Sequence, residues 1–192
     1  DYVLRSRKEL GKMPANPGCI RSIVTSPFGD YICKKYGVTM FDCLTGFKWI
    51  DAKEAEFEKA GTHEYVFGLE ESYGYKIERE VMDKDGVSAA AMCAEMILYW
   101  RSQGKSLLEH LDDMYKEFGY FEDRAISQNF PGASGGETMK AMMANMRKTP
   151  PATLGGEKVI KVRDLMCDPD LPKSNVLQFY LESGTIVSAR PS

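Results

Sequence analysis

Residues 68–75 hold the densest group of side chains that could do chemistry. Glu70, Glu71 and Ser72 follow one another there, directly after the apolar run 64–67, which is typical of a buried strand. Loops at strand ends are where α/β proteins gather ligands. Carboxylates accept hydrogen bonds and a serine hydroxyl donates or accepts them, which suits neighbouring hydroxyls of a sugar. The pattern indicates a polyol-binding loop, and a solvated acidic turn is the alternative.

Two other positions could serve the same ligand. Lys84 precedes an expected helix that begins near Gly86, so its charge and the helix N-terminus would both favour a phosphate. The alternative is a solvated turn cation. Thr45 and Gly46 follow the expected strand 38–41, where they could offer a hydroxyl and a close backbone approach. The alternative there is a tight turn.

The elements that must position these residues alternate between strand and helix up to about residue 85. A helix is expected to open at Ser26-Pro27, with serine as the N-cap and proline at the first helical position, and to close at Gly37. The full expectation is strands at 19–25, 38–41 and 64–67, with helices at 26–37 and 51–60. This order predicts a sheet with helices on both faces and loops along one edge.

Helices are also expected at the start of the chain and after Lys84. The first is amphipathic, with Val3, Leu4 and Leu10 on one face. A capping box of Ser106 and Glu109 predicts another that ends near residue 119. The helix after Lys84 has apolar residues at a 3.6-residue period, namely Val87, Ala90, Ala91, Ala94, Ile97 and Leu98.

The pattern changes after residue 119. Residues 120–136 are rich in glycine, asparagine and proline, which is typical of a linker. A short helix follows with methionines on one stripe, more typical of a core than of a copper site: Met139, Met142, Met143 and Met146. Strands are expected at 159–162, 176–181 and 185–189, the last two as a hairpin. This part of the chain has an α+β pattern.

Composition narrows the class of protein. The chain has 192 residues, is 43% hydrophobic and carries a net charge of −3, which argues against a nucleic-acid partner. No apolar run approaches the ~20 residues that span a bilayer, so no membrane partner is expected. The five cysteines form no C-x-x-C pair and are expected to be reduced thiols in the core. Two histidines are too few for a histidine metal cage.

Four short motifs resemble those of the α-D-phosphohexomutases, the phosphoglucomutase/phosphomannomutase superfamily, and occur in the same order. Residues 68–72 (G-L-E-E-S) resemble its sugar-binding G-E-x-S loop, with Leu69 inserted after the glycine. Residues 45–48 (T-G-F-K) resemble its T-G-[FW]-K loop, and residues 84–86 (K-D-G) its K-D-G helix entry. Residues 190–192 (R-P-S) resemble the start of its R-P-S-G-T phosphate loop. The E-E-S-Y-G-Y segment is similar to that of bacterial phosphoglucomutases.

The resemblance implies a fold and a set of ligand contacts. Residues 1–119 would form the third, sugar-binding domain, an α/β domain of three layers (α/β/α) with a mixed sheet. Residues 120–192 would form part of the small α+β fourth domain, which binds phosphate. Glu71 is expected to face away from Glu70, because neighbours in an extended segment face opposite sides. The implied substrate-binding residues are Thr45, Gly46, Glu70, Ser72, Lys84, Arg190 and Ser192.

The superfamily's phosphoserine loop (T-A-S-H-N-P type) and magnesium loop (D-G-D-x-D-R type) are missing, so no catalytic residue and no metal ligand is assigned. Gly74 also stands where some members have a histidine. The chain is interpreted as an inactive fragment of a longer cytoplasmic phosphoglucomutase. The full-length parent would use Mg²⁺ and an activator of the glucose 1,6-bisphosphate type. Its partners would be the phosphosugar and the remaining domains of the same polypeptide.

Other functions stay open at this point. Phosphomannomutase and phosphopentomutase are the alternatives within the enzyme interpretation, because the loop must bind hydroxyls in each case. A non-catalytic phosphosugar-binding module belongs to a different class. A nucleotide-binding oxidoreductase fits the alternation of strand and helix, but the chain lacks the G-x-G-x-x-G fingerprint.

Overall fold

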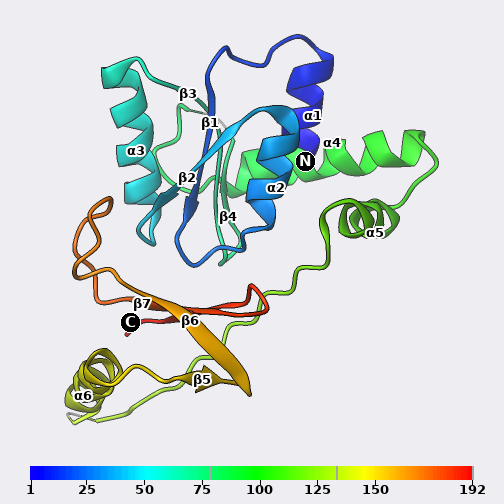
Figure 1. Cartoon of the computed structure of the whole chain (residues 1–192). Coiled ribbons are helices and arrows are strands. Elements are labelled where there is room, and N and C mark those ends of the chain that lie inside the picture. The colour runs from blue at the N-terminus through cyan, green and yellow to red at the C-terminus, as the bar shows by residue number, and fades with distance from the viewer. Residues whose placement is uncertain (78, 133, 192) are drawn as a thin grey trace. The chain divides into compact units, whose positions relative to one another are not determined.

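The computed structural model describes residues 1–77, 79–132 and 134–191. The chain divides into two compact units, Asp1–Asp123 and Arg124–Ser192, and each is described by itself (Figure 1). In the described residues no helix is long and apolar enough to cross a membrane.

The first unit is built on a mixed sheet with the strand order β2-β1-β3-β4. Strand β1 runs parallel to both β2 and β3, whereas β4 returns antiparallel to β3. The bounds are β1 (Pro17–Ser22), β2 (Thr39–Cys43), β3 (Glu64–Glu70) and β4 (Gly74–Lys76). Helices α2 (Phe28–Tyr36) and α3 (Phe47–Ala60) make the crossovers between the parallel strands. The carboxyl ends of β1, β2 and β3 therefore meet at one edge of the sheet.

Helices cover both faces of this sheet, which confirms the predicted three-layer α/β/α fold. Figure 1 shows α3 on one face and α1 (Tyr2–Glu9) and α2 on the other. Each face has its own core. The α3 side buries Ile20, Cys43, Phe47, Ile50, Phe57 and Tyr65, and the opposite side buries Leu4, Cys19, Cys33, Val38 and Val66. Leu10 was expected on the buried face of α1 but is exposed, because it follows the end of that helix.

Several expectations about the ends of elements were wrong. Strand β1 ends at Ser22 rather than at residue 25. Helix α3 begins at Phe47 rather than at residue 51, so Phe47 and Lys48 belong to its first turn and not to a loop. Strand β3 extends to Glu70 rather than ending at residue 67, because it pairs with β4. Helix α2 begins at Phe28 and Pro27 is its N-cap. The Ser26 hydroxyl still accepts a hydrogen bond from the Phe28 N–H, at 3.3 Å.

Helices α4 (Gly86–Ser102) and α5 (Leu107–Phe118) follow the sheet. Asp85 caps α4 by accepting from the N–H groups of Val87 and Ser88, and the capping box of Ser106 and Glu109 opens α5 as predicted. All six of the apolar positions expected to face a core on α4 are exposed. Trp100 is the residue that α4 buries within the described part of the chain.

The first unit continues four residues beyond the expected boundary at 119/120. Phe121 stacks on Phe28 with ring centroids 4.9 Å apart. The Tyr115 hydroxyl donates to the Phe121 carbonyl at 3.1 Å. These contacts hold residues 120–123 against α2 and α5, so the linker composition that begins at residue 120 does not mark the end of the unit.

The second unit is an antiparallel sheet of order β5-β6-β7-β8 with one described helix, α6 (Gly135–Lys148). Its strands are β5 (Thr153–Leu154), β6 (Glu157–Asp164), β7 (Leu177–Leu181) and β8 (Ile186–Ala189). The predicted methionine core is confirmed in part. Met143 is buried against Leu177 and Phe179 with Met146 beside it, whereas Met142 is exposed.

Candidate functional site

Glu70 is the last residue of β3 and lies at the carboxyl edge of the sheet. The residue is only 7% exposed, but its carboxylate oxygens keep some access to solvent and form no hydrogen bond or ion pair with any described residue. It packs against Gly74, where an added Cβ would lie 2.9 Å from the Glu70 Cγ and 2.5 Å from the Phe47 ring. A carboxylate with little access to water gains from any group that donates a hydrogen bond to it. Glu70 is therefore suited to receive hydrogen bonds from a ligand.

Glu71 and Ser72 occupy the turn between β3 and β4. The Ser22 hydroxyl at the end of β1 donates to Glu71 Oε2 at 2.7 Å and also contacts the Thr25 hydroxyl at 2.9 Å. Glu71 is thus occupied by the protein itself, and Ser72 is exposed at the tip of the turn. The two adjacent carboxylates have different surroundings, and only Glu70 lacks a partner among the described residues.

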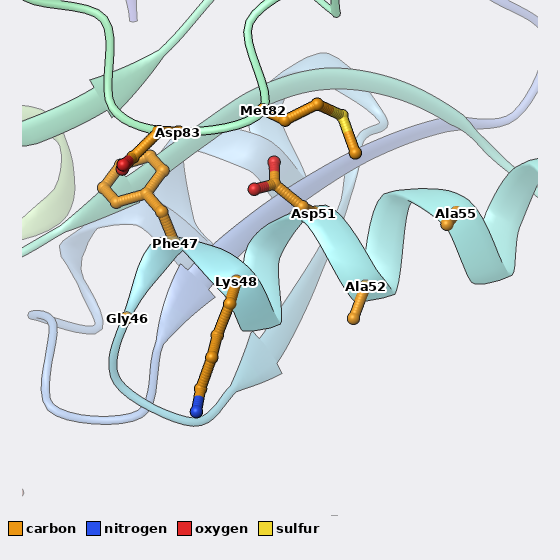
Figure 2. Close-up of a pocket in the computed structure, with 8 residues that line it drawn as sticks. All are labelled: Gly46, Phe47, Lys48, Asp51, Ala52, Ala55, Met82 and Asp83. Atoms are coloured by element: carbon orange, nitrogen blue, oxygen red, sulfur yellow. The ribbon is translucent and has the colours of Figure 1, made fainter.

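Thr45 and Gly46 lead into the first turn of α3 and are both half-buried. Gly46 is the N-cap, with φ at 112°, a left-handed backbone conformation that favours glycine. No side chain caps this helix. The Trp49 N–H already donates to the Gly46 carbonyl at 2.9 Å, so the N–H groups of Phe47 and Lys48 are the ones at this helix start that could meet an anion, and the helix dipole adds to their attraction. Lys48 is exposed, lies over the Trp49 ring and points away from residues 82 and 83 (Figure 2).

Lys84 reaches the same place from the segment after β4. Its Nζ lies 5.8 Å from the centre of the Phe47 ring, and its side chain is otherwise exposed. The next residue, Asp85, donates its N–H to the Tyr75 carbonyl at 2.9 Å, which ties the entry of α4 to the hairpin. Hydrogen bonds from Ser88 and Val87 hold the pKa of the Asp85 carboxyl below its usual value.

Phe47 is the residue that joins these parts, and it was missed as a site residue from the sequence. Its ring touches the hairpin at Gly74 and lies beneath Lys84, while its backbone starts α3 directly after Gly46. An open hollow of about 630 Å³ adjoins it and is lined by Gly46, Phe47, Lys48, Asp51, Ala52, Ala55, Met82 and Asp83 (Figure 2). The aromatic position in the T-G-F-K motif was the signal that could have pointed to it.

A buried ion cluster of Lys76, Asp51 and Glu54 joins α3 to β4 next to the site. No pattern in the sequence indicated it. Lys76 is fully buried, and its Nζ lies 2.6 Å from Asp51 Oδ1 and 2.5 Å from Glu54 Oε2. Arg79 donates to the other oxygen of Glu54 at 2.9 Å. Burial lowers the pKa of Lys76, but the hydrogen bonds to Asp51 and Glu54 outweigh it, so that the pKa is raised. The cluster fastens α3 to the end of the hairpin.

The remaining predicted residues belong to the second unit. Arg190 follows β8 and is exposed, and Ser192 lies outside the described residues. Thr45, Gly46, Glu70, Ser72 and Lys84 all belong to the first unit. Across the described ranges, no three His, Cys, Asp or Glu side chains are grouped so that they could hold a metal ion.

Comparison with known sequences identifies the protein family of this chain. The family model described as "Phosphoglucomutase/phosphomannomutase, alpha/beta/alpha domain III" matches residues 2–118, which is more than half of the chain. The chain belongs to the phosphoglucomutase/phosphomannomutase family. The match ends at the last residue of α5, so it lies within the first unit.

Relatives in this family match most of the chain. A phosphoglucomutase of Staphylococcus haemolyticus is 29% identical over 196 residues, covering 96% of the chain and 35% of the relative. A Haemophilus influenzae protein named "Probable phosphomannomutase" is 36% identical over 172 residues, covering 89% of the chain and 33% of the relative. The chain thus spans about a third of the length of these curated relatives.

A solved structure from Thermus thermophilus, provisionally assigned as a phosphomannomutase, has the same fold. It matches with a TM-score of 0.54 and 18% identity, covering 99% of this chain and 36% of that chain. At this identity the likeness concerns the fold of the phosphoglucomutase/phosphomannomutase family and not the substrate.

Proposed function

We propose that this chain is the sugar-recognition part of a phosphohexomutase, most closely a phosphoglucomutase, that interconverts hexose 1-phosphate and hexose 6-phosphate. The observation that carries the proposal is Glu70, which is 7% exposed and whose carboxylate has no partner among the described residues, near Gly46 and Lys84. Family membership and phosphoglucomutase relatives support the same function.

Each residue has a chemical role in this proposal. Glu70 and Ser72 hold neighbouring sugar hydroxyls, the carboxylate as acceptor and the serine as donor or acceptor. Lys84 supplies a charge-assisted hydrogen bond to the phosphosugar, and Thr45 and Gly46 contact the ligand at the start of α3. Arg190 and Ser192 contribute to phosphate binding from the second part of the chain. A site that grips a pair of hydroxyls can hold the sugar in both of the orientations that the reaction requires.

The phosphoryl transfer itself belongs to other parts of the complete polypeptide. A phosphoserine would donate the phosphoryl group, a bisphosphate would form and reorient, and Mg²⁺ would stabilise the transferring charge. An activator of the glucose 1,6-bisphosphate type would prime the serine, and the remaining domains would close around the phosphosugar. We place the complete enzyme in the cytoplasm.

The test is a kinetic comparison in the complete polypeptide with Mg²⁺ and glucose 1,6-bisphosphate. Glu70→Gln keeps the shape but removes the charge, so transition-state stabilisation should fall by about 1.5–3 kcal/mol. Glu71→Gln is the matched control, because Glu71 already accepts from Ser22. It should change kcat/KM by less than threefold. Equal effects at the two positions, or wild-type kinetics for Glu70→Gln, would refute the assignment.

Phosphomannomutase is the second candidate, favoured by the 36% identity to the Haemophilus influenzae protein. The same assay separates the two when glucose 1-phosphate, mannose 1-phosphate and ribose 1-phosphate are compared at equal concentrations. The highest kcat/KM identifies the sugar, and a preference for ribose 1-phosphate would place the enzyme with the phosphopentomutases.

A further inference from the structure

The turn of the β3–β4 hairpin contains a strained tyrosine. Glu70 and Gly74 pair directly opposite each other, so the turn consists of Glu71, Ser72 and Tyr73. Tyr73 has φ at 60°, and no other non-glycine residue has a positive φ in the described part of the chain. Three-residue hairpin turns place a left-handed residue at this last position, where glycine is favoured. Tyr73 therefore places a large side chain at a position where the backbone conformation is strained for any residue other than glycine.

The fold makes no use of that side chain. Tyr73 is 87% exposed. Its ring stacks on no aromatic or cationic group, and its hydroxyl forms no hydrogen bond, within the described ranges. A strained residue whose side chain contributes no packing is a candidate for a functional role, because strain of this kind is concentrated at ligand-binding sites.

Both neighbours of the turn's tip contact other parts of the first unit. Glu71 is held by the Ser22 hydroxyl on one side. On the other side Gly74 is pressed against Phe47 and Glu70, with no room for a Cβ. Tyr73 therefore lies between two residues that contact the rest of the unit, and three residues along the chain from Glu70, whose carboxylate has no partner among the described residues.

We propose that Tyr73 is a sugar-contacting residue whose ring packs against the C–H face of the phosphosugar while Glu70 and Ser72 bind its hydroxyls. This inference rests on the proposed function. A sugar ring combines hydroxyls at its edge with faces of C–H groups, and binding sites pair a few polar contacts with apolar and aromatic surface. The ring of Tyr73 supplies that surface, and its hydroxyl is not needed for the contact.

Four variants of the complete polypeptide test this contact through KM, kcat and melting temperature. Tyr73→Gly removes the ring and the strain together, and Tyr73→Asn removes the ring with a residue that tolerates left-handed backbone. Both should raise KM for the phosphosugar about tenfold and change kcat less than threefold. The melting temperature should be unchanged or higher. Tyr73→Phe should keep KM within twofold. Tyr120→Ser, which removes another highly exposed tyrosine of the first unit, should leave KM unchanged.

Three results would overturn the inference. Wild-type KM in Tyr73→Gly and Tyr73→Asn would show that the ring does not touch the sugar. A tenfold loss in Tyr73→Phe would assign the contact to the hydroxyl instead. A lower melting temperature of the complete polypeptide in both ring-removing variants, without the same drop in the 192-residue chain, would show that Tyr73 packs against another part of the protein.

Failure of this inference is distinguishable from failure of the proposed function. If Glu70→Gln is impaired while the Tyr73 variants behave as wild type, the sugar-binding function stands and only the contact by Tyr73 is lost. If Glu70→Gln shows wild-type kinetics as well, the proposed function fails and the contact by Tyr73 fails with it.

Discussion

Replacing Lys76 with methionine should destabilise the first unit strongly. Methionine is close to lysine in length, so the substitution keeps most of the packing and removes the charge. The Lys76 side chain is fully buried between Asp51 and Glu54, which are themselves nearly inaccessible to water. Without the ammonium group these two carboxylates lose their buried counter-charge.

The loss of unfolding free energy in Lys76→Met depends on the charges that stay buried after the substitution. Removing one partner of a buried ion pair costs about 3–5 kcal/mol, because the other charge stays buried without compensation. Glu54 would keep its contact with Arg79, at 2.9 Å, so Asp51 is the carboxylate that suffers most. We therefore expect a loss near the lower end, about 3 kcal/mol. Because the pKa of Lys76 is raised, this stabilisation is complete at neutral pH and is lost as the pH rises above about 10.4.

Urea unfolding monitored by tryptophan fluorescence is the suitable assay. Both tryptophans, Trp49 and Trp100, lie in the first unit, so the signal reports on that unit alone. Lys116→Met is the matched control, because Lys116 forms an exposed pair with Asp113 at 3.5 Å and should cost less than about 1 kcal/mol. Adding Asp51→Asn to Lys76→Met should recover part of the loss. A loss below about 1 kcal/mol for Lys76→Met, or no recovery in the double variant, would refute the reasoning.

Three further predictions concern activity and pH. The isolated 192-residue chain should not convert glucose 1-phosphate with Mg²⁺ and bisphosphate, and turnover above a heat-killed control would contradict this. In the complete polypeptide Lys84→Met should lower kcat/KM by about 1.5–3 kcal/mol while the melting temperature stays the same, because the side chain is exposed; unchanged kinetics would leave Lys84 as a solvated turn cation. Burial, followed by Arg5, lowers the pKa of His110 to about 4, so the unfolded state takes up a proton first as the pH falls. The free energy of unfolding should therefore drop by about 1–3 kcal/mol between about pH 6.5 and 4, and His110→Gln should flatten that slope.

Local signals in the sequence predicted much of the fold. These signals depend only on residues close together in the sequence. They are the left-handed Gly37 at the end of α2, the capping box at Ser106 and the apolar runs of β2 and β3, and the structure has each close to its expected position. The order of strands and helices then sufficed for a three-layer domain. The motifs likewise pointed to Glu70 and Lys84, which the structure places around Phe47.

What the sequence did not predict depends on contacts between distant residues. Strand β4 has only three residues, one of them glycine, and it exists because it pairs with β3. The stacking of Phe121 on Phe28 joins residues 93 positions apart, so the composition of residues 120–136 could not reveal it. The burial of Lys76 depends on carboxylates 22 and 25 positions away on α3. A lysine in a short strand otherwise suggests a solvent-facing residue.

The two exposed cysteines allow the distance between the two units to be measured on the natural sequence. Cys93 on α4 and Cys167 between β6 and β7 are exposed, one in each unit, whereas Cys19, Cys33 and Cys43 are buried. The expectation that all five lie in a core was wrong for the exposed pair. Thiol reactivity requires access, so maleimide dyes should select the exposed Cys93 and Cys167. At Cys43 burial also raises the pKa to about 12, which disfavours the reactive thiolate. A donor and an acceptor dye on the natural sequence would then report the distance between the two units, and its change when a phosphosugar is added, without a single engineered residue.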